Sequence, residues 1–315
     1  MPRKPRIHFP GAVYHVILRG NAGQEVFLDE ADRSRFYLLL QEGTERFGHR
    51  IHAFCLMSNH LHLIVQVNDV PLSRIMQNLG FRYTQFCNRK RKKAGHLFQG
   101  RYKALLIDAD SYLLELVRYI HLNPVRAGMV VHPHKYPWSG HRAYLGLEVL
   151  PWLTTDWVYS CFAPNREEAL RHYNYFITGG LQEDYREEFH RGSFQGRALG
   201  DDVFIDKALA QAEEAFNRPP AIETVIQAVC SIYALTTAEM ASRGRARPIS
   251  EARAVAALLI RETDGLSLRD LGKALNQDLS SLSQAARRLE IRIQENPGLK
   301  EKLEAVKRNI PTCQA

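Results

Sequence analysis

Two histidines separated by one residue are the first candidates for chemistry in this chain. His60 and His62 flank Leu61 in the apolar run HLHLIVQV. Side chains two apart on a β-strand point to the same side, so both imidazoles can approach one ion. Imidazole suits borderline divalent metals, and an added oxygen ligand also admits Mg²⁺ or Mn²⁺. Because the chain has 13 histidines, the pattern is also compatible with two exposed or internally hydrogen-bonded side chains.

Tyr119 and Asn123 form a second pair with possible chemistry. They lie in the segment YLLELVRYIHLNPVRAG (residues 112–128), whose apolar residues recur with the period of an amphipathic helix. Four residues apart, they lie one helical turn from each other on the same side. A phenol is a covalent nucleophile, and an amide oxygen can bind a hard metal ion. Taken singly, they are more typical of structure, as a half-buried aromatic ring and a helix C-terminal residue before Pro124.

The elements that must position these residues alternate between strand and helix patterns. We expect strands within 12–21, 51–57, 60–67 and 101–107, helices over 29–48 and 71–93, and a further helix from about 110 to 123. The order βαββαβ is typical of a ferredoxin-like α+β fold, with four antiparallel strands and two helices on one face. Apolar residues at successive strand positions indicate a sheet covered on both faces. The helix at 110–123 is the expected cover of the second face.

The positive charge of the chain is concentrated at its beginning. The whole chain carries a net charge of +8, while residues 1–150 carry +10, residues 151–220 carry −5 and residues 221–315 carry +3. A basic excess favours a polyanionic partner such as nucleic acid, although a surface tuned for solubility would have the same balance.

Two basic groups could hold phosphates within this excess. Arg101 and Lys103 lie two apart on the fourth expected strand and would share one face. The second group is the run at the end of the helix over 71–93, which is alternatively a solvated helix end: Arg89, Lys90, Arg91, Lys92 and Lys93.

Composition indicates an ordinary globular protein with reduced thiols. The five cysteines are scattered singly and form no CxxC pair, which argues against a disulfide framework or a zinc–cysteine site. The basic N-terminus is not followed by an apolar signal region, and no run approaches the length of a membrane span. We therefore expect a cytoplasmic protein without a membrane partner.

The length of 315 residues suggests two domains joined by a connecting module. Residues 138–220 are less regular, and the stretch 179–202, rich in glycine and charge, predicts a surface loop. Several aromatic residues there look like packing anchors on short helices: Trp138, Trp152, Trp157, Tyr173, Tyr175 and Phe176. From about residue 219 onward the pattern is all helical. We expect a catalytic domain over 1–137, a helical extension and linker over 138–220, and a third module over 221–315.

The third module has the rhythm of a helix-turn-helix. Ser267 opens the short helix SLRDLGKAL, Gln277 and Asp278 turn the chain, and Ser280 or Ser281 begins a second helix. The E-A-R opening at 251–253, the stretch GLSLRDLG and the ending S-x-x-S-x-A-x-R-R-L resemble the duplex-binding C-terminal domain of the replication initiator DnaA. In that interpretation one group of residues approaches bases and two arginines hold the DNA backbone: Gln277, Asp278, Ser280, Ser281 and Ser283, with Arg287 and Arg288. A helical bundle used for packing or dimerisation is the alternative.

Four segments of the first module together resemble a known family. FPGAVYHVILRGN (9–21), FCLMSNHLHLIVQ (54–66), LFQGRYKALLID (97–108) and VRYIHLNPVRAGMV (117–130) occur in the order found in the REP-associated tyrosine transposases, members of the single-tyrosine HUH transposase superfamily. The resemblance implies that His60, His62 and Asn123 bind a divalent metal ion, Mg²⁺ or Mn²⁺, and that Tyr119 is the nucleophile.

The same resemblance implies a reaction and a substrate. It predicts a metal-dependent endonuclease and strand-transferase for single-stranded DNA, working through a 5′-phosphotyrosine on hairpin DNA with a short single-stranded flank. A DNA-binding regulator that cuts nothing, built on a retired transposase scaffold, is the alternative. A larger HUH replication initiator is disfavoured because the chain has no GxxxxGK[ST] helicase motif. Both a monomer and a homodimer fit the sequence.

Overall fold

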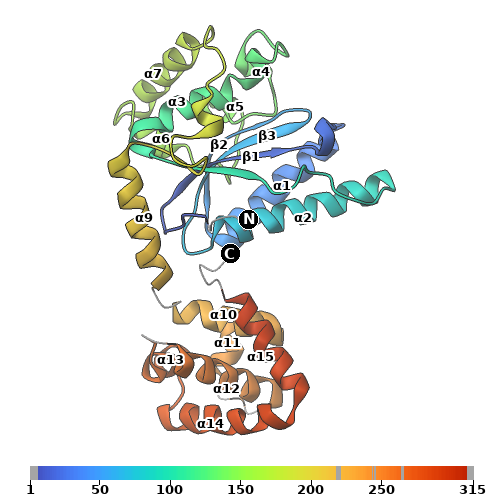
Figure 1. Cartoon of the computed structure of the whole chain (residues 1–315), viewed down its shortest axis with the longest axis vertical. Helices are drawn as coiled ribbons and strands as arrows, with labels where there is room; N and C mark the ends of the chain where they lie inside the picture. The colour runs from blue at the N-terminus through green and yellow to red at the C-terminus, as the bar shows by residue number, and fades with distance from the viewer. Residues whose placement is uncertain (1–5, 218–220, 243, 245, 264–265, 311–315) are drawn as a thin grey trace. The chain divides into compact units, whose positions relative to one another are not determined.

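The chain folds into two compact units, the first ending at Ala215 and the second beginning at Phe216. The computed structural model describes residues 6–217, 221–242, 244, 246–263 and 266–310. Figure 1 shows a sheet with helices in the first unit and helices in the second. Among the described residues, no helix combines the length and apolar composition that crossing a membrane requires.

The first unit is built on a five-stranded sheet in the order β2-β3-β1-β4-β5. The strands are β1 Val13–Arg19, β2 Arg50–Leu56, β3 His60–Gln66, β4 Lys103–Ile107 and β5 Ala198–Leu199. The first four pair antiparallel, which confirms the expected α+β, ferredoxin-like arrangement. The two-residue β5 was not expected, and it pairs parallel with β4.

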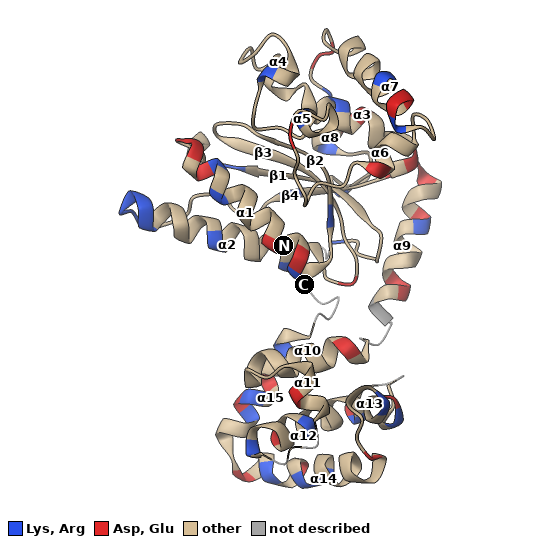
Figure 2. Ribbon diagram, turned by 180° about the vertical axis from the view of Figure 1, so that it is seen from behind, with Lys and Arg blue, Asp and Glu red and all other residues tan. Residues whose placement is uncertain are grey.

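Two long helices, α1 (Glu30–Phe47) and α2 (Leu72–Arg91), pack against one face of the sheet. Asp29 caps α1 by accepting a hydrogen bond from the backbone of Asp32, and Gly48 ends it in the left-handed conformation. The last turn of α2 consists of basic residues, which are blue at the end of this helix in Figure 2.

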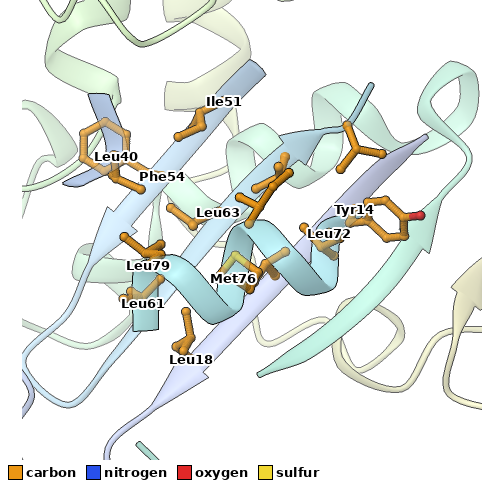
Figure 3. Packing of buried hydrophobic residues seen from close by; sticks show 14 of the residues in the cluster. Tyr14, Leu18, Leu40, Ile51, Phe54, Leu61, Leu63, Leu72, Met76 and Leu79 are labelled. Carbon is orange, nitrogen blue, oxygen red and sulfur yellow. The ribbon is translucent and has the colours of Figure 1, made fainter. Parts of the chain in front are cut away.

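Strict alternation along the strands divides their side chains between two cores. Leu61 and Leu63 of β3 point toward α2, where they meet Met76 and Leu79 (Figure 3). The intervening residues of β3, among them the two histidines, therefore face the opposite layer. This alternation places the candidate metal ligands away from the α1–α2 side.

The helix α3 (Ala109–His121) covers the second face, as the sequence predicts, and the short α4 (Asn123–Arg126) follows it. The short η1 (Asn21–Gly23) follows β1 directly. Between α4 and Gly180 the chain forms η2 (Pro133–Lys135), α5 (His141–Tyr144), α6 (Asp156–Ser160) and α7 (Arg166–Gly179). Of the expected aromatic anchors, Tyr173 is fully buried and Trp152 is buried, while Trp138, Trp157 and Phe176 are partly buried. Tyr175 was wrongly assigned to this set, because it is 81% exposed.

The stretch 179–202 is not simply the surface loop that its composition predicts. It contains α8 (Glu188–Arg191) and β5, and Phe189 is fully buried in the second core. At Gly192 the backbone has a positive φ, and a Cβ there would lie 2.4 Å from the carbonyl oxygen of Ala198. Glycine at this position permits the close backbone approach that brings the segment back to the sheet.

The helix α9 (Asp202–Asn217) crosses the boundary after Ala215, and the described elements of the second unit are all helical, as predicted. Its helices are α10 (Ile222–Tyr233), α11 (Thr237–Ala241), α12 (Arg247–Glu262), α13 (Leu268–Leu275), α14 (Leu279–Glu295) and α15 (Pro297–Asn309). Residues 252–260 of α12 are all buried, so this helix forms the centre of the unit. A Cβ on Gly272 of α13 would meet the carbonyl oxygen of Gln277 at 2.8 Å, so glycine allows the tight turn into α14.

Candidate active site

A cleft of about 580 Å³ opens on the second face of the sheet. Its walls come from β1, β3, the α3–α4 connection and the segment 184–190. It brings together the four residues that the sequence singles out, which are His60, His62, Tyr119 and Asn123. The same cleft is lined by Ile17, Arg19, Met57, Asn59, Arg126, Ala127, Asp184, Tyr185 and His190.

The two histidines hold fixed places in the strand register. His62 lies opposite Ile17 of β1, and His60 lies opposite Arg19. The ring centroids of His60 and His62 are 5.1 Å apart. Both rings therefore reach the same cleft, as the two-residue period of a strand predicts.

A chain of hydrogen bonds fixes which nitrogen of His62 carries the free lone pair. The carbonyl oxygen of Phe189 can only accept, so His15 donates to it from Nδ1 at 2.9 Å. A neutral His15 then accepts at Nε2 from Nδ1 of His62, also at 2.9 Å. His62 is left with an unprotonated Nε2, the state in which imidazole binds a metal ion.

His60 is oriented in the same way by its neighbour. The amide nitrogen of Asn59 donates to the carbonyl of Gly23, which assigns the remaining side-chain atom as the oxygen Oδ1. Nδ1 of His60 donates to that oxygen at 2.7 Å. The lone pair of His60 therefore also resides on Nε2.

Burial keeps the histidines of this cluster neutral. It lowers the pKa of His60 to about 4, with Arg19 and His190 adding to the effect. It lowers the pKa of His62 well below the usual value, reinforced by His15, whose own pKa falls to about 3. Neutral imidazoles are the form that can donate electron pairs to a cation.

Tyr119 and Asn123 reach the cleft from the end of α3. The α3 helix stops at His121, slightly earlier than predicted, but the chain continues through Leu122 into α4. The amide nitrogen of Asn123 donates to the carbonyl of Tyr119 at 3.4 Å, so the side-chain oxygen is the atom that Asn123 can offer to a metal ion. Burial raises the pKa of the Tyr119 phenol, and the nearby Arg126 opposes this rise.

The donor set fits a divalent cation. Two neutral imidazoles and one amide oxygen line the same cleft, and mixed nitrogen and oxygen ligands suit ions such as Mn²⁺. No group of three or more His, Cys, Asp or Glu side chains within the described ranges is arranged to hold a metal ion. The amide of Asn123 is a side chain that such a grouping does not count, and it is the oxygen donor that the sequence predicts beside the two histidines.

Sequence reasoning missed several residues of this site, among them His15, Arg19, Arg126 and His190. Arg126 lies seven residues after Tyr119, and its guanidinium sits 4.0 Å from the centre of the Tyr119 ring. A spacing of seven residues is about two helical turns, so the sequence could have placed Arg126 on the same side as Tyr119. His15 and Arg19 needed the strand register. His190 belongs to a segment that was predicted to be a surface loop.

The basic run at the end of α2 is divided between two roles. Lys90 donates to Asp29 and Asp32, and Arg91 donates to Asp32 and to a backbone carbonyl. These two cations tie α2 to the start of α1. Arg89, Lys92 and Lys93 are exposed. Arg89, Lys92 and Lys93 make no ion pair with these two aspartates.

Arg101 and Lys103 do not share a face, contrary to expectation. The strand β4 begins at Lys103, and Arg101 precedes it in irregular backbone. Lys103 pairs with Ile17, so it projects to the side of the histidines. Arg101 instead lines a separate cavity of about 500 Å³ beside α2, together with Phe81 and Tyr102.

In the second unit, the predicted turn lies between α13 and α14. Gln277 donates to the carbonyls of Ser242 and Leu275, and Asp278 caps α14 by accepting from the backbone of Ser281. These two residues shape the turn. The remaining candidates are exposed on α14, where Ser280 also donates to Asp278: Ser280, Ser281, Ser283, Arg287 and Arg288.

Comparison with known proteins matches each unit to a different family. Residues 9–123 match the family described as Transposase IS200 like, and residues 222–289 match the family described as Bacterial dnaA protein helix-turn-helix. The first unit thus carries an IS200-like transposase domain, and the second carries a DnaA-type helix-turn-helix domain.

A particular relative narrows the first assignment. A Haemophilus influenzae protein described as a REP-associated tyrosine transposase is 24% identical over 147 residues, which are 40% of this chain and 81% of that protein. The similarity to REP-associated tyrosine transposases that the motifs predict is therefore confirmed.

Two solved structures also align with the chain. A REP-associated tyrosine transposase bound to a REP hairpin covers 49% of this chain and 90% of its own, with 18% identity and a TM-score of 0.40. A Deinococcus radiodurans protein assigned as a transposase covers 36% of this chain and 94% of its own, with 17% identity and a TM-score of 0.27.

Proposed function

We propose that the first unit cuts and rejoins single-stranded DNA through a covalent bond between Tyr119 and a 5′ phosphate, assisted by a divalent metal ion. One observation carries the proposal: a single cleft collects two histidines whose Nδ1 atoms are hydrogen-bonded, which leaves Nε2 for a metal ion, together with an asparagine and a tyrosine. Residues 9–123 match a transposase family, which supports a reaction that cuts and rejoins DNA strands.

His60, His62 and Asn123 are the residues that would hold Mg²⁺ or Mn²⁺. When bound, the ion polarises the scissile phosphate and neutralises charge that develops on its oxygens. The chain adds positive charge of its own, because Arg19 and Arg126 line the same cleft. Guanidinium groups suit phosphate oxygens, so these arginines would orient the DNA backbone.

The reaction conserves the energy of the phosphodiester bond. The Tyr119 oxygen attacks phosphorus and the 3′ oxygen of the preceding nucleotide leaves, which gives a free 3′ end and a 5′-phosphotyrosine. A later 3′-hydroxyl attacks the phosphotyrosine and restores a phosphodiester. Cutting and joining therefore use the same residues in opposite directions.

Hairpin DNA with a single-stranded flank is the substrate that we propose. In-line attack by a phenol held at the end of a helix needs a strand flexible enough to present one phosphate. The sequence motifs and the H. influenzae relative both point to transposases associated with REP palindromes. Lys103 and the exposed residues Arg89, Lys92 and Lys93 are candidate phosphate contacts, and Arg101 is a more distant one.

For the second unit we propose binding of duplex DNA through α14. Its exposed serines and arginines lie at the start and middle of the helix that follows the turn, which is the recognition position of a helix-turn-helix. Ser280, Ser281 and Ser283 would approach bases, and Arg287 and Arg288 would hold phosphates. Gln277 and Asp278 would act mainly by shaping the turn.

A labelled-strand experiment tests the cleavage proposal. Hairpin DNA labelled at its 3′ end is incubated with the protein and Mn²⁺, and the label should move with the protein on a denaturing gel. The Tyr119→Phe variant should form no adduct. Tyr112→Phe, a change of the same kind on the same helix outside the cleft, should form as much adduct as the wild type. An adduct in Tyr119→Phe would overturn the assignment.

The alternative function, a regulator that binds without cutting, makes a different prediction in the same assay. Wild-type protein would shift the hairpin on a native gel yet yield no adduct and no shortened 5′-labelled fragment. The complete set of four cleft residues favours the enzyme, because binding alone does not require a nucleophile beside metal ligands.

A further inference from the structure

We infer that His190 accepts the proton of the Tyr119 hydroxyl during strand cleavage, so that a residue outside the transposase family segment completes the catalytic centre. The family match ends at residue 123, whereas His190 follows 71 residues after the tyrosine. This inference rests on the proposed function, because it concerns the same nucleophile.

The contact between the two side chains has the geometry of proton transfer. Nε2 of His190 lies 2.8 Å from the hydroxyl oxygen of Tyr119, within the reach required of a general base. The rings meet edge to face, at an interplanar angle of 79°. Both residues line the cleft that holds His60 and His62. His190 thus touches the atom that would form the new bond to phosphorus.

Several contacts hold His190 in place. The preceding residue, Phe189, is fully buried, and its ring lies 5.1 Å from that of Tyr119. The ring of Tyr185 stacks on His190 with centroids 4.8 Å apart. Arg186 forms an ion pair with Glu115 of α3 at 2.7 Å. The segment is therefore fastened to the same helix that carries the nucleophile.

The segment also serves the other half of the site. The carbonyl of Phe189 accepts from His15, which in turn accepts from His62. Two consecutive residues thus serve both the proposed metal ligands and the proposed nucleophile. Phe189 orients His62 through His15, and His190 accepts a hydrogen bond from the Tyr119 hydroxyl. Such a double contact is what an element built into the active site would provide.

Two other groups next to Tyr119, Arg126 and Asn123, are less suited to take its proton. The Arg126 guanidinium lies over the ring and donates to the backbone carbonyl of Tyr119, but it has no lone pair to accept with. The Asn123 amide also donates to that carbonyl. His190 is a ring nitrogen base placed directly at the hydroxyl.

The proton and electron balance is simple. As the Tyr119 oxygen bonds to phosphorus, its proton passes to Nε2 of His190. The bond from phosphorus to the 3′ oxygen breaks, and that oxygen leaves with the electron pair and takes a proton from water. In rejoining, an incoming 3′-hydroxyl loses its proton to water, and the departing Tyr119 oxygen recovers a proton from His190.

The test compares full-length variants under single-turnover conditions with 3′-labelled hairpin DNA and Mn²⁺. His190→Ala should slow adduct formation by roughly 100-fold, a typical contribution of general base catalysis, with unchanged affinity for the hairpin. Added imidazole should restore part of the rate. His190→Gln keeps a hydrogen-bonding side chain but cannot carry the proton, so it should be slow as well. His172→Ala, which removes an exposed histidine of α7, should match the wild type.

Each outcome decides the matter. A wild-type or faster rate in His190→Ala would overturn the inference, and a faster rate would identify the segment as an obstruction. Full activity in His190→Gln, or no rescue by imidazole in a variant that melts like the wild type, would also reject proton acceptance. If His190→Ala fails to fold, His190→Gln carries the test. Absence of an adduct with wild-type protein would instead refute the proposed function itself.

Discussion

The two units differ in how they assemble their candidate sites. The cleft of the first unit draws on residues from β1, β3, the end of α3 and the segment 184–190, which are far apart in sequence. The helix-turn-helix of the second unit lies within residues 268–295. All 13 histidines and all three tryptophans belong to the first unit. Covalent chemistry needs groups converging from several directions, whereas groove recognition needs one exposed helix.

Removal of divalent metal should distinguish the activities of the two units most strongly. EDTA should lower covalent cleavage by roughly 1,000-fold, because the charge on the scissile phosphate loses its main stabilisation. Binding of duplex DNA by the second unit should be unchanged in a filter-binding assay. Restoring Mn²⁺ should restore cleavage in the wild type but not in His60→Ala/His62→Ala, while His96→Ala, an exposed control, should respond fully. An adduct formed in EDTA would exclude the metal role.

Acid should destabilise the first unit selectively. Burial lowers the pKa of His49 and His141 to about 4 in the folded state, against about 6.5 when unfolded. The unfolded chain then binds more protons between these values, so stability is present above pH 6.5 and falls as the pH drops toward 4. We expect a loss on the order of 5 kcal/mol across this window from the buried histidines together.

Tryptophan fluorescence follows this acid effect in the first unit alone, since the tryptophans are at 138, 152 and 157. Urea midpoints measured by fluorescence should fall steeply between pH 7 and pH 5. His49→Leu should weaken the dependence by removing one titrating group. A transition in far-UV circular dichroism that fluorescence does not follow reports the second unit, and equal acid sensitivity there would contradict the histidine explanation.

The sequence predicts much of the first unit because its signals are local. Strand alternation and helical spacing place His60 with His62 and Tyr119 with Asn123, and βαββαβ order brings the pairs to one sheet. His190 could not be found this way. Its segment is short, charged and rich in glycine, and its place depends on Phe189 filling a core made by distant elements.

The second unit was predictable for the same reason, and more completely, because its signals are local throughout. The capping serine at 267 and the turn at 277–278 lie beside the helices that they define. Even so, the local sequence pattern did not reveal that the side-chain amide of Gln277 donates a hydrogen bond to the carbonyl of Ser242. A residue that was predicted to contact bases can thus be engaged in hydrogen bonds within the protein, which the spacing of residues in the sequence does not indicate.

Loss of a buried arginine should weaken only the second unit. Arg253 of α12 is buried and donates to the carbonyls of Met240 and Gly244, both at 2.8 Å. Arg253→Met keeps the aliphatic stem but leaves these acceptors without a donor, at a cost of about 3 kcal/mol. The urea midpoint of the second unit, measured by far-UV circular dichroism, should fall. The urea midpoint of the first unit, measured by tryptophan fluorescence, should stay unchanged.

Arg261→Met provides the control for that change, because Arg261 lies on the same helix in an exposed ion pair with Glu290. Its effect on unfolding should stay within about 0.5 kcal/mol. Equal shifts for both substitutions would show that the buried donors have no special weight. A shift of the tryptophan transition with Arg253→Met would show that the units unfold together.

The smallest expected effect is on the salt dependence of duplex binding. Arg288 is exposed on α14 and is a proposed phosphate contact. Arg288→Ala should weaken duplex binding about threefold to tenfold and reduce the slope of log affinity against log salt by about 1, because one fewer counterion is released. Arg308 is an exposed residue of α15, so Arg308→Ala removes the same charge elsewhere and should leave this slope nearly unchanged. Since Arg288 lies in the second unit, adduct formation on hairpin DNA should keep its wild-type rate. If the two alanine variants lose affinity and slope equally, the attraction reflects the overall charge of the unit, and α14 is not the recognition helix.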